Sequence, residues 1–315
     1  MQRLLLLSAV LLPYALSGCS RLPPTDTTEP SWQWTVTHHP TEATTLVTGG
    51  TDGALYFYTG DSLFDTAHFG GIITELRWHP GGRLLAVAVQ GGGRTTTYNT
   101  ATGARTALDS LDEFGVRAIG WEASGSRLAT GDYSGNITLY DTTGTLLAQY
   151  PTAQKGLIGL DWSPDGRTLA AVGEDLLLMN VATGTYLAIA DRAEEILLLS
   201  VAYHPSGKLL ATGDYGDDTH PPLLQFWDSQ GNRLLRIDEA RGPYRSLEWS
   251  HDGSTLAAVS DAIRLYDREG KKIGEQRVPG DRLLWGLSWA PDDRQLTVTD
   301  EGGAYRQYST ESIKQ

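Results

Sequence analysis

Short segments in which apolar and polar residues alternate recur along almost the whole chain. In LIGLDWSPDGRTLAAVG, Leu160 and Trp162 flank Asp161, and this period of two predicts a β-strand with two different faces. Pro164-Asp165-Gly166 then predicts a tight turn, because proline presets φ and glycine accepts positive φ. The small apolar run Thr168–Val172 predicts a second strand that is buried on both faces.

Two further strands complete the pattern. After a second turn at Gly173-Glu174-Asp175, residues Leu176–Met179 predict a third strand. A shorter fourth strand is clearest in another copy, where Lys272–Gln276 follow the turn Arg268-Glu269-Gly270. Each copy of the pattern therefore predicts four antiparallel strands.

The copies align on one anchor position, which is aromatic in six of them and histidine in a degenerate first copy. The anchors are His38, Trp78, Trp121, Trp162, Tyr203, Trp249 and Trp289. Successive anchors are 40 to 46 residues apart, a period typical of propeller blades. We therefore expect an all-β fold, a seven-bladed β-propeller of four-stranded antiparallel blades over residues 32–315.

The closure of the ring has two alternatives. After Tyr308 only seven residues remain, so one alternative is that Ser312–Lys314 complete the last blade as a short strand. The other is that residues 29–34 do so as an N-terminal strand, which would use Trp32. We favour the N-terminal strand.

The repeats resemble those of the WD40 family from Trp34 to Tyr308. The likeness lies in the ends of the third strands, such as Phe226-Trp227-Asp228, and in aspartates at turns of the repeat. These turn aspartates are Asp52, Asp132, Asp175, Asp214, Asp261 and Asp300. No copy has the family's Gly-His pair, and Trp-Asp is intact only at Trp227-Asp228, so we expect no complete hydrogen-bonded tetrad in any blade. A YVTN-like or quinoprotein-like propeller is the alternative for the same strand pattern.

The N-terminal segment predicts export. Arg3 precedes the apolar run Leu4–Leu16, which is shorter than the roughly 20 residues of a membrane-spanning helix. Leu16-Ser17-Gly18-Cys19 resembles the lipobox of bacterial lipoproteins, and Cys19 is the only cysteine of the chain. The resemblance implies cleavage before Cys19, acylation of its thiol and new amino group, and, with Ser20 next, the outer membrane.

These features divide the chain into three parts. Residues 1–18 are the expected lipoprotein signal peptide, residues 19–31 a lipidated cysteine with a polar, proline-containing tether, and residues 32–315 the propeller. We expect a monomeric propeller in the bacterial cell envelope, anchored by lipid and facing the periplasm. The formal net charge of −13 argues against nucleic acid as a partner.

The sequence motivates no catalytic residue, metal or cofactor. It contains no G-x-S-x-G elbow, HExxH or phosphate-binding loop. His39, His79 and His204 share the position after the anchor, so they would be spread around a rim and would not converge on one zinc ion. The acidic loop Gly213–His220 is long enough for a Ca²⁺ site but lacks the spacing of a known calcium loop, so we favour a solvated loop.

The expected binding surface is the face that carries the turns after the second strands. Around the channel mouth, the repeat places seven residues four positions before the anchors: Trp34, Thr74, Arg117, Ile158, Leu199, Arg245 and Trp285. Tryptophan and arginine are frequent interface hot spots. Acidic residues also gather on this face: the turn aspartates, Glu174, Asp217, Asp218 and Glu301, and, from the loops between blades, Asp112, Glu113, Glu194 and Glu195.

We therefore predict eight residues that bind a partner: Trp34, Arg117, Asp217, Asp218, Arg245, Trp285, Asp300 and Glu301. The function expected from the resemblance and this surface is a lipid-anchored scaffold for a protein partner of the envelope. Two alternatives are a small-molecule-binding or enzymatic propeller that uses the central channel, and a lipoprotein that aids outer-membrane protein assembly.

Overall fold

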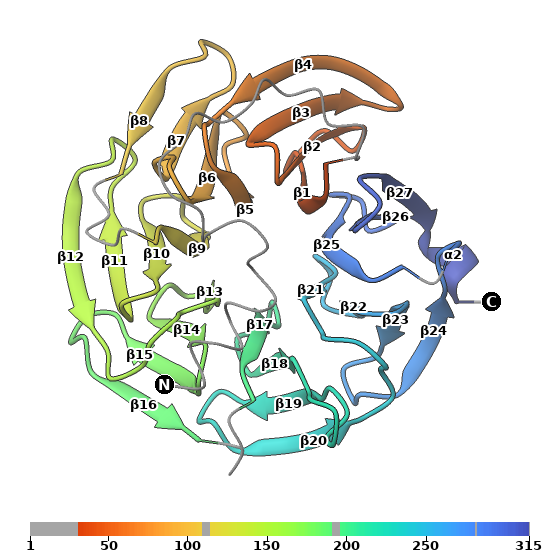
Figure 1. Cartoon of the computed structure of the whole chain (residues 1–315). Helices are drawn as coiled ribbons and strands as arrows, with labels where there is room; N and C mark the ends of the chain where they lie inside the picture. The colour runs from red at the N-terminus through yellow and green to blue at the C-terminus, as the bar shows by residue number, and fades with distance from the viewer. Residues whose placement is uncertain (1–30, 109–113, 191–195, 281, 315) are drawn as a thin grey trace.

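The repeats fold into seven antiparallel sheets that surround a central channel (Figure 1). The structure is a computed structural model that describes residues 31–108, 114–190, 196–280 and 282–314. Within this part of the chain, six sheets have four strands and the last has three, always in chain order from the channel outwards. The predicted seven-bladed propeller is confirmed.

The strands are given from the channel outwards. The innermost strands are β1 (Gln33–His38), β5 (Ile72–Trp78), β9 (Val116–Trp121), β13 (Gly159–Trp162), β17 (Leu198–Tyr203), β21 (Ser246–Trp249) and β25 (Leu284–Trp289). The second strands are β2 (Thr45–Gly50), β6 (Leu84–Gln90), β10 (Leu128–Asp132), β14 (Thr168–Val172), β18 (Leu209–Asp214), β22 (Leu256–Val259) and β26 (Gln295–Asp300). Each anchor residue is thus the last residue of an innermost strand.

The third and fourth strands form the outer half of each blade. The third strands are β3 (Ala54–Thr59), β7 (Thr96–Asn99), β11 (Asn136–Tyr140), β15 (Leu176–Asn180), β19 (Leu224–Asp228), β23 (Ile263–Tyr266) and β27 (Tyr305–Ser309). The outermost strands are β4 (Ser62–His68), β8 (Arg105–Ala107), β12 (Leu146–Pro151), β16 (Tyr186–Ile189), β20 (Arg233–Ile237) and β24 (Lys272–Gln276).

The closure of the ring differs from both predicted alternatives. Gln33 and Trp34 belong to β1, which pairs with β2 in the first blade and not with the last blade. After β27 the chain forms the short helix α2 (Thr310–Ile313), whose Ile313 is buried among the side chains of the last two blades. The ring closes by packing of β1 against β25 and β26, where the His38 N–H donates to Ser288 Oγ at 3.0 Å.

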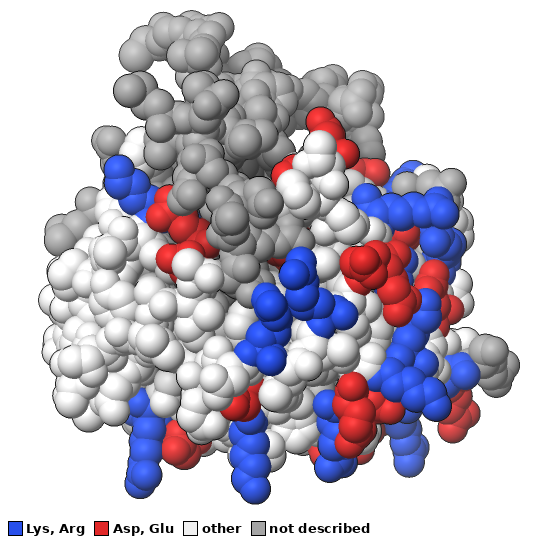
Figure 2. All heavy atoms as spheres, turned by 90° about the horizontal axis from the view of Figure 1, so that it is seen from below, with Lys and Arg blue, Asp and Glu red and all other residues white. Residues whose placement is uncertain are grey.

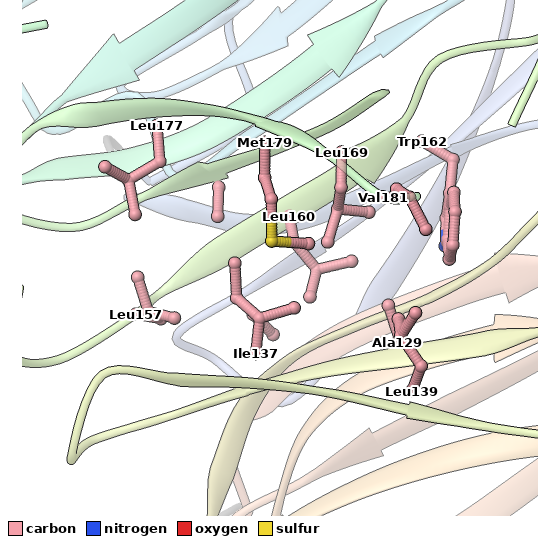
Figure 3. Packing of buried hydrophobic residues seen from close by; sticks show 12 residues of the cluster. Ala129, Ile137, Leu139, Leu157, Leu160, Trp162, Leu169, Leu177, Met179 and Val181 are labelled. Carbon is pink, nitrogen blue, oxygen red and sulfur yellow. The ribbon is translucent and has the colours of Figure 1, made fainter. Parts of the chain in front are cut away.

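Apolar layers between neighbouring blades form the core. Figure 3 shows one of them, in which Ile137 and Leu139 of the third blade face Leu160, Leu169 and Met179 of the fourth. Burial of each such side chain stabilises the fold by about 1.5–3 kcal/mol. The small residues of the second strands allow this close approach of the sheets.

Polar contacts join the blades at the rim beside the anchors. The Nε2 atoms of His39, His79 and His204 lie 2.8–3.0 Å from a turn glycine carbonyl of the next blade. Each of these rings also packs edge-on against the next anchor tryptophan, with centroids 4.7–4.9 Å apart. In the third blade Arg127 makes the equivalent contacts: it donates a hydrogen bond to the Gly166 carbonyl, and its guanidinium lies over the Trp162 ring. These histidines are therefore structural contacts between blades.

Candidate functional site at the channel mouth

A cavity of about 90 Å³ lies at the mouth of the central channel. The seven residues that the repeat places four positions before the anchors all line it: Trp34, Thr74, Arg117, Ile158, Leu199, Arg245 and Trp285. Each stands within two residues of the start of an innermost strand, so the seven-fold repetition brings residues from distant parts of the chain to one place.

Aromatic rings build one wall of this cavity where the first and last blades meet. The indoles of Trp34 and Trp285 are stacked, with centroids 4.9 Å apart and planes 9° from parallel. The ring centroid of Trp32 lies 6.1 Å from that of Trp285, and Trp32 is 43% exposed. Such stacking fixes the ring positions, because aromatic pairs prefer offset parallel or edge-on arrangements.

Two guanidinium groups lie against these indoles. The Arg245 guanidinium is 3.7 Å from the centroid of the Trp285 ring, and the Arg117 guanidinium is 5.9 Å from that of Trp34. Burial lowers the pKa of Arg245 to about 10, and the nearby charge of Arg117 acts in the same direction. In the part of the chain that the structure describes, neither arginine forms an ion pair with a carboxylate.

Deeper in the channel the charge changes sign. Glu75 and Arg77 form an ion pair at 2.7 Å, and the Arg77 side chain keeps 40% of its surface accessible although it lies inside the ring. Asp161 and Glu248 occupy the position of Arg77 in two other blades, one residue before the anchor. Among the described residues, this part of the wall therefore carries the carboxylates of Glu75, Asp161 and Glu248 and the guanidinium of Arg77.

Each of these carboxylates accepts a hydrogen bond from the backbone of the next blade. Glu75 accepts from the Ile119 N–H at 2.9 Å, and Asp161 accepts from the Tyr203 N–H at 2.7 Å. Glu248 accepts from the Trp289 N–H at 3.3 Å. The three contacts join β5 to β9, β13 to β17 and β21 to β25.

Burial perturbs the titration of these groups. It raises the pKa of Asp161 to about 6 and that of Glu248 to about 7, partly opposed by the charge of Arg77 and by the backbone N–H donors. Burial also raises the pKa of Glu75, against the opposing charge of Arg77. Desolvation disfavours the charged form of each carboxyl group, which is the usual effect of a low-dielectric interior.

The acidic residues predicted to bind a partner divide into two kinds. Asp217 and Asp218 are exposed on the loop after β18, and Glu301 is half-buried after β26. Asp300, however, is 1% exposed and contacts Arg282 and Arg306, so its burial does not support a direct partner contact. Hydrogen bonds from Thr219 and His220 hold the pKa of Asp217 well below its usual range.

The turn aspartates are mostly structural. Asp132 and Asp214 are buried, and their Oδ1 atoms accept backbone N–H bonds within their own loops. Asp261 pairs with Arg264 and Arg277. Asp112, Glu113, Glu194, Glu195 and Cys19 lie outside the described residues. The acidic face is thus smaller than the sequence predicts.

The outer wall of the propeller carries mixed charge. Figure 2 shows basic and acidic side chains interspersed on the side of the disc that holds β20 and β24. Lys272 there contacts both Glu239 and Glu275. Among the described residues, no group of three or more His, Cys, Asp or Glu side chains is placed to hold a metal ion. The described part of the chain also has no helix of the length and apolar character needed to cross a membrane.

The charged residues inside the channel were not among those predicted from the sequence. Glu75, Arg77, Asp161 and Glu248 stand at alternating positions opposite the apolar side chains of innermost strands. A charged residue between two apolar residues of a predicted innermost strand, as in Leu160-Asp161-Trp162 or Leu247-Glu248-Trp249, could have indicated them. Such a strand faces the channel on one side and the next blade on the other.

The chain is similar to proteins built from WD repeats. The WD repeat-containing protein WRAP73 of Mus musculus is 23% identical over 256 residues, which cover 69% of this chain and 53% of that protein. Actin-interacting protein 1 of Drosophila melanogaster is 25% identical over 214 residues, covering 62% of this chain and 34% of that protein. The intraflagellar transport protein 80 homolog of Mus musculus is 23% identical over 183 residues, covering 58% of this chain and 23% of that protein.

No family model matches the chain. The chain spans between 23% and 53% of the length of these three relatives. Together with the seven blades, the likenesses define the class: the chain is a seven-bladed propeller whose repeats are similar to those of WD-repeat proteins.

Proposed function

We propose that this propeller is a scaffold, without catalytic activity, that binds a protein partner at the channel mouth and the loops beside it. The observation that carries the proposal is the cluster of Trp34, Trp285, Arg117 and Arg245, in which two guanidiniums lie against stacked indoles at the edge of an open cavity. Interface hot spots are enriched in these residue types. The name of actin-interacting protein 1 states a protein partner for one relative.

The proposed partner-binding residues are Trp34, Arg117, Arg245 and Trp285 at the mouth, with Asp217, Asp218 and Glu301 beside them. Their support is location: the first four line one cavity, and Asp217, Asp218 and Glu301 lie on loops at the same ends of the strands. Of these residues, Asp217 and Asp218 are exposed, whereas Trp34 and Trp285 are each 8% exposed. A rigid disc with preformed side chains loses little conformational entropy when it binds.

The proposal includes attachment to a bacterial envelope membrane through lipid on Cys19, with the outer membrane as the favoured location. Its support is the lipobox-like Leu16-Ser17-Gly18-Cys19 and the polar tether that follows. Metabolic labelling with a palmitate analogue tests it: label on the wild type but not on Cys19→Ala supports the anchor, and label on neither contradicts it.

Crosslinking in living cells tests the scaffold. Tagged wild type, the double variant Arg117→Gln/Arg245→Gln, and the charge reversal Asp217→Lys/Asp218→Lys/Glu301→Lys are crosslinked, and the captured proteins are identified by mass spectrometry. We expect one recurrent partner, reduced by at least one set of changes. Arg167→Gln is the matched control, because its side chain is 85% exposed on another turn. Capture that is the same in all four proteins would contradict this binding surface.

A further inference from the structure

The channel mouth has an excess of hydrogen-bond donors and positive charge. Three arginines and one glutamate line the cavity, and the glutamate, Glu75, is paired with Arg77. The buried Nε of Arg245 and the buried Nε1 atoms of Trp34 and Trp285 have no acceptor among the described residues. A buried donor without an acceptor costs about 1–3 kcal/mol, so such a group calls for an explanation.

The two arginines without an ion-pair partner are held in place although their charges repel. The Arg245 guanidinium carbon is 3.7 Å from the centroid of the Trp285 ring and 5.9 Å from that of Tyr215, whose side chain also interacts with it, while the buried Nε of Arg245 has no acceptor among the described residues. Arg117 is near enough to lower the pKa of Arg245. Glu301 and Glu75 act on Arg245 and Arg117, respectively, from beyond ion-pair distance.

We propose that the channel mouth binds a carboxylate group, which Arg245 receives with the support of Arg117 beside the stacked indoles of Trp34 and Trp285. The inference rests on the proposed function, because it names the chemical group of the partner that enters the mouth: the side chain of a glutamate or aspartate, or a chain end. A free small carboxylate is the other source of the same group.

Charge favours carboxylate over phosphate at this site, because both groups can accept parallel N–H···O bonds from a guanidinium. Glu75 lines the cavity, and Asp161 and Glu248 lie near Arg77, so a phosphate group with a charge of about −1.5 to −2 would meet stronger repulsion than a monoanion. A volume of about 90 Å³ accommodates a carboxylate on a short apolar stem.

The test uses the purified full chain in detergent, with the indole N–H resonances followed by NMR. The probes are propionate, which mimics a glutamate side chain, inorganic phosphate, and three short peptides: one with an internal Glu and an amidated end, its Gln counterpart, and one with only a free C-terminal carboxylate. Trp285→Phe and Trp34→Phe assign the two resonances.

We expect propionate and at least one carboxylate peptide to shift the Trp34 and Trp285 resonances, and the Gln peptide not to do so. Arg245→Gln should weaken binding by about tenfold or more, and Arg117→Gln by less, since Arg245 is in closer contact with the indoles. Arg167→Gln should leave binding unchanged. Circular dichroism of each variant establishes that it is folded.

Two results would overturn the inference: no shift with any carboxylate, or tighter binding of phosphate than of propionate. The peptides separate the sources, because a preference for either carboxylate peptide over propionate indicates a protein-borne group. The proposed function can fail separately: carboxylate binding with no captured partner would leave a site for a free small carboxylate. If Arg245→Gln leaves the capture of the partner unchanged and no carboxylate binds, the carboxylate inference fails and the proposed scaffold function stands.

Discussion

The upper and lower parts of the central channel bury charges of opposite sign in opposite ways. In the lower part, Glu75, Asp161 and Glu248 each accept a backbone N–H of the next blade. In the upper part, Arg117 and Arg245 lie against indoles and have no carboxylate within ion-pair distance among the described residues. Arg117 and Arg245 share one repeat position, four residues before the anchor, and Asp161 and Glu248 share another, one residue before it, whereas Glu75 stands three residues before its anchor.

The difference separates structural charge from charge that is available for binding. A buried charge with fixed hydrogen bonds holds neighbouring elements in register, and its loss leaves their donors unpaired. A buried charge without a partner costs free energy in the free protein, and a ligand of opposite charge recovers it. The channel therefore combines three contacts between blades with one site that is open to a ligand.

The largest expected effect is at Asp161. Asp161→Ala leaves the N–H groups of Tyr203 and Trp162 without their acceptor, so we expect the free energy of unfolding to fall by about 2–5 kcal/mol. Asp161→Asn retains a carbonyl acceptor, so its free energy of unfolding should fall by less than that of Asp161→Ala. Urea denaturation measures the stability of both variants. An unchanged midpoint for Asp161→Ala would show that the hydrogen bonds of Asp161 do not stabilise the fold.

The second expected effect is a dependence of stability on pH. The folded pKa values of Asp161, about 6, and Glu248, about 7, are raised above those of the unfolded chain, so the folded state holds protons that the unfolded state releases. This contribution to stability is fully present below about pH 4 and is lost as the pH rises through 6 to 7, by at most about 1.4 kcal/mol per pH unit for each group.

Other carboxyl groups have lowered pKa values and act in the opposite direction, for example Glu122, whose pKa is about 2 beside Arg127. The informative quantity is therefore the difference between wild type and Glu248→Gln, measured by urea denaturation from pH 4.5 to 8. We expect wild type to lose stability relative to the variant as the pH rises. A constant difference would contradict the raised pKa of Glu248.

A smaller effect is expected at the rim, where contacts are also satisfied. His204→Ala removes the hydrogen bond to the Gly253 carbonyl and the edge contact with Trp249, so stability should fall by about 1–2 kcal/mol. The matched control is His68→Ala, at an exposed position of β4, which should change stability by less than about 0.5 kcal/mol. Equal losses in the two variants would argue against a specific contact between blades.

The smallest expected effect on stability is at Arg245. Arg245→Gln loses the contact with Trp285 but also removes a poorly solvated charge beside Arg117, so the free energy of unfolding should change by less than about 1 kcal/mol. The thermal unfolding midpoint of the variant measures this change. A loss as large as that of Asp161→Ala would mean that Arg245 has a structural role and would remove the contrast between the two parts of the channel.

The repeat was sufficient to predict the blades and the ring of residues at the mouth. Each anchor, from His38 to Trp289, ends an innermost strand, and the residue four positions earlier lines the cavity in all seven copies. A strict period carries three-dimensional information, because equivalent positions of a propeller are related by rotation about the channel. The repeat could not show which turn aspartates are exposed, since burial of Asp300 depends on the separate side chains of Arg282 and Arg306.

The sequence by itself determined the all-β class, the number of blades, the anchor positions and the residues at the channel mouth, because these follow from periodic patterns of strand and turn residues. Tertiary structure alone decided the rest. It placed α2 where one of the two predicted closures had a short strand, and it joined the blades through Glu75, Asp161 and Glu248. It also stacked Trp34 on Trp285 across the closure of the ring. The physical reason is that these contacts join residues from different blades, and their hydrogen bonds and desolvation depend on distances that no local pattern encodes.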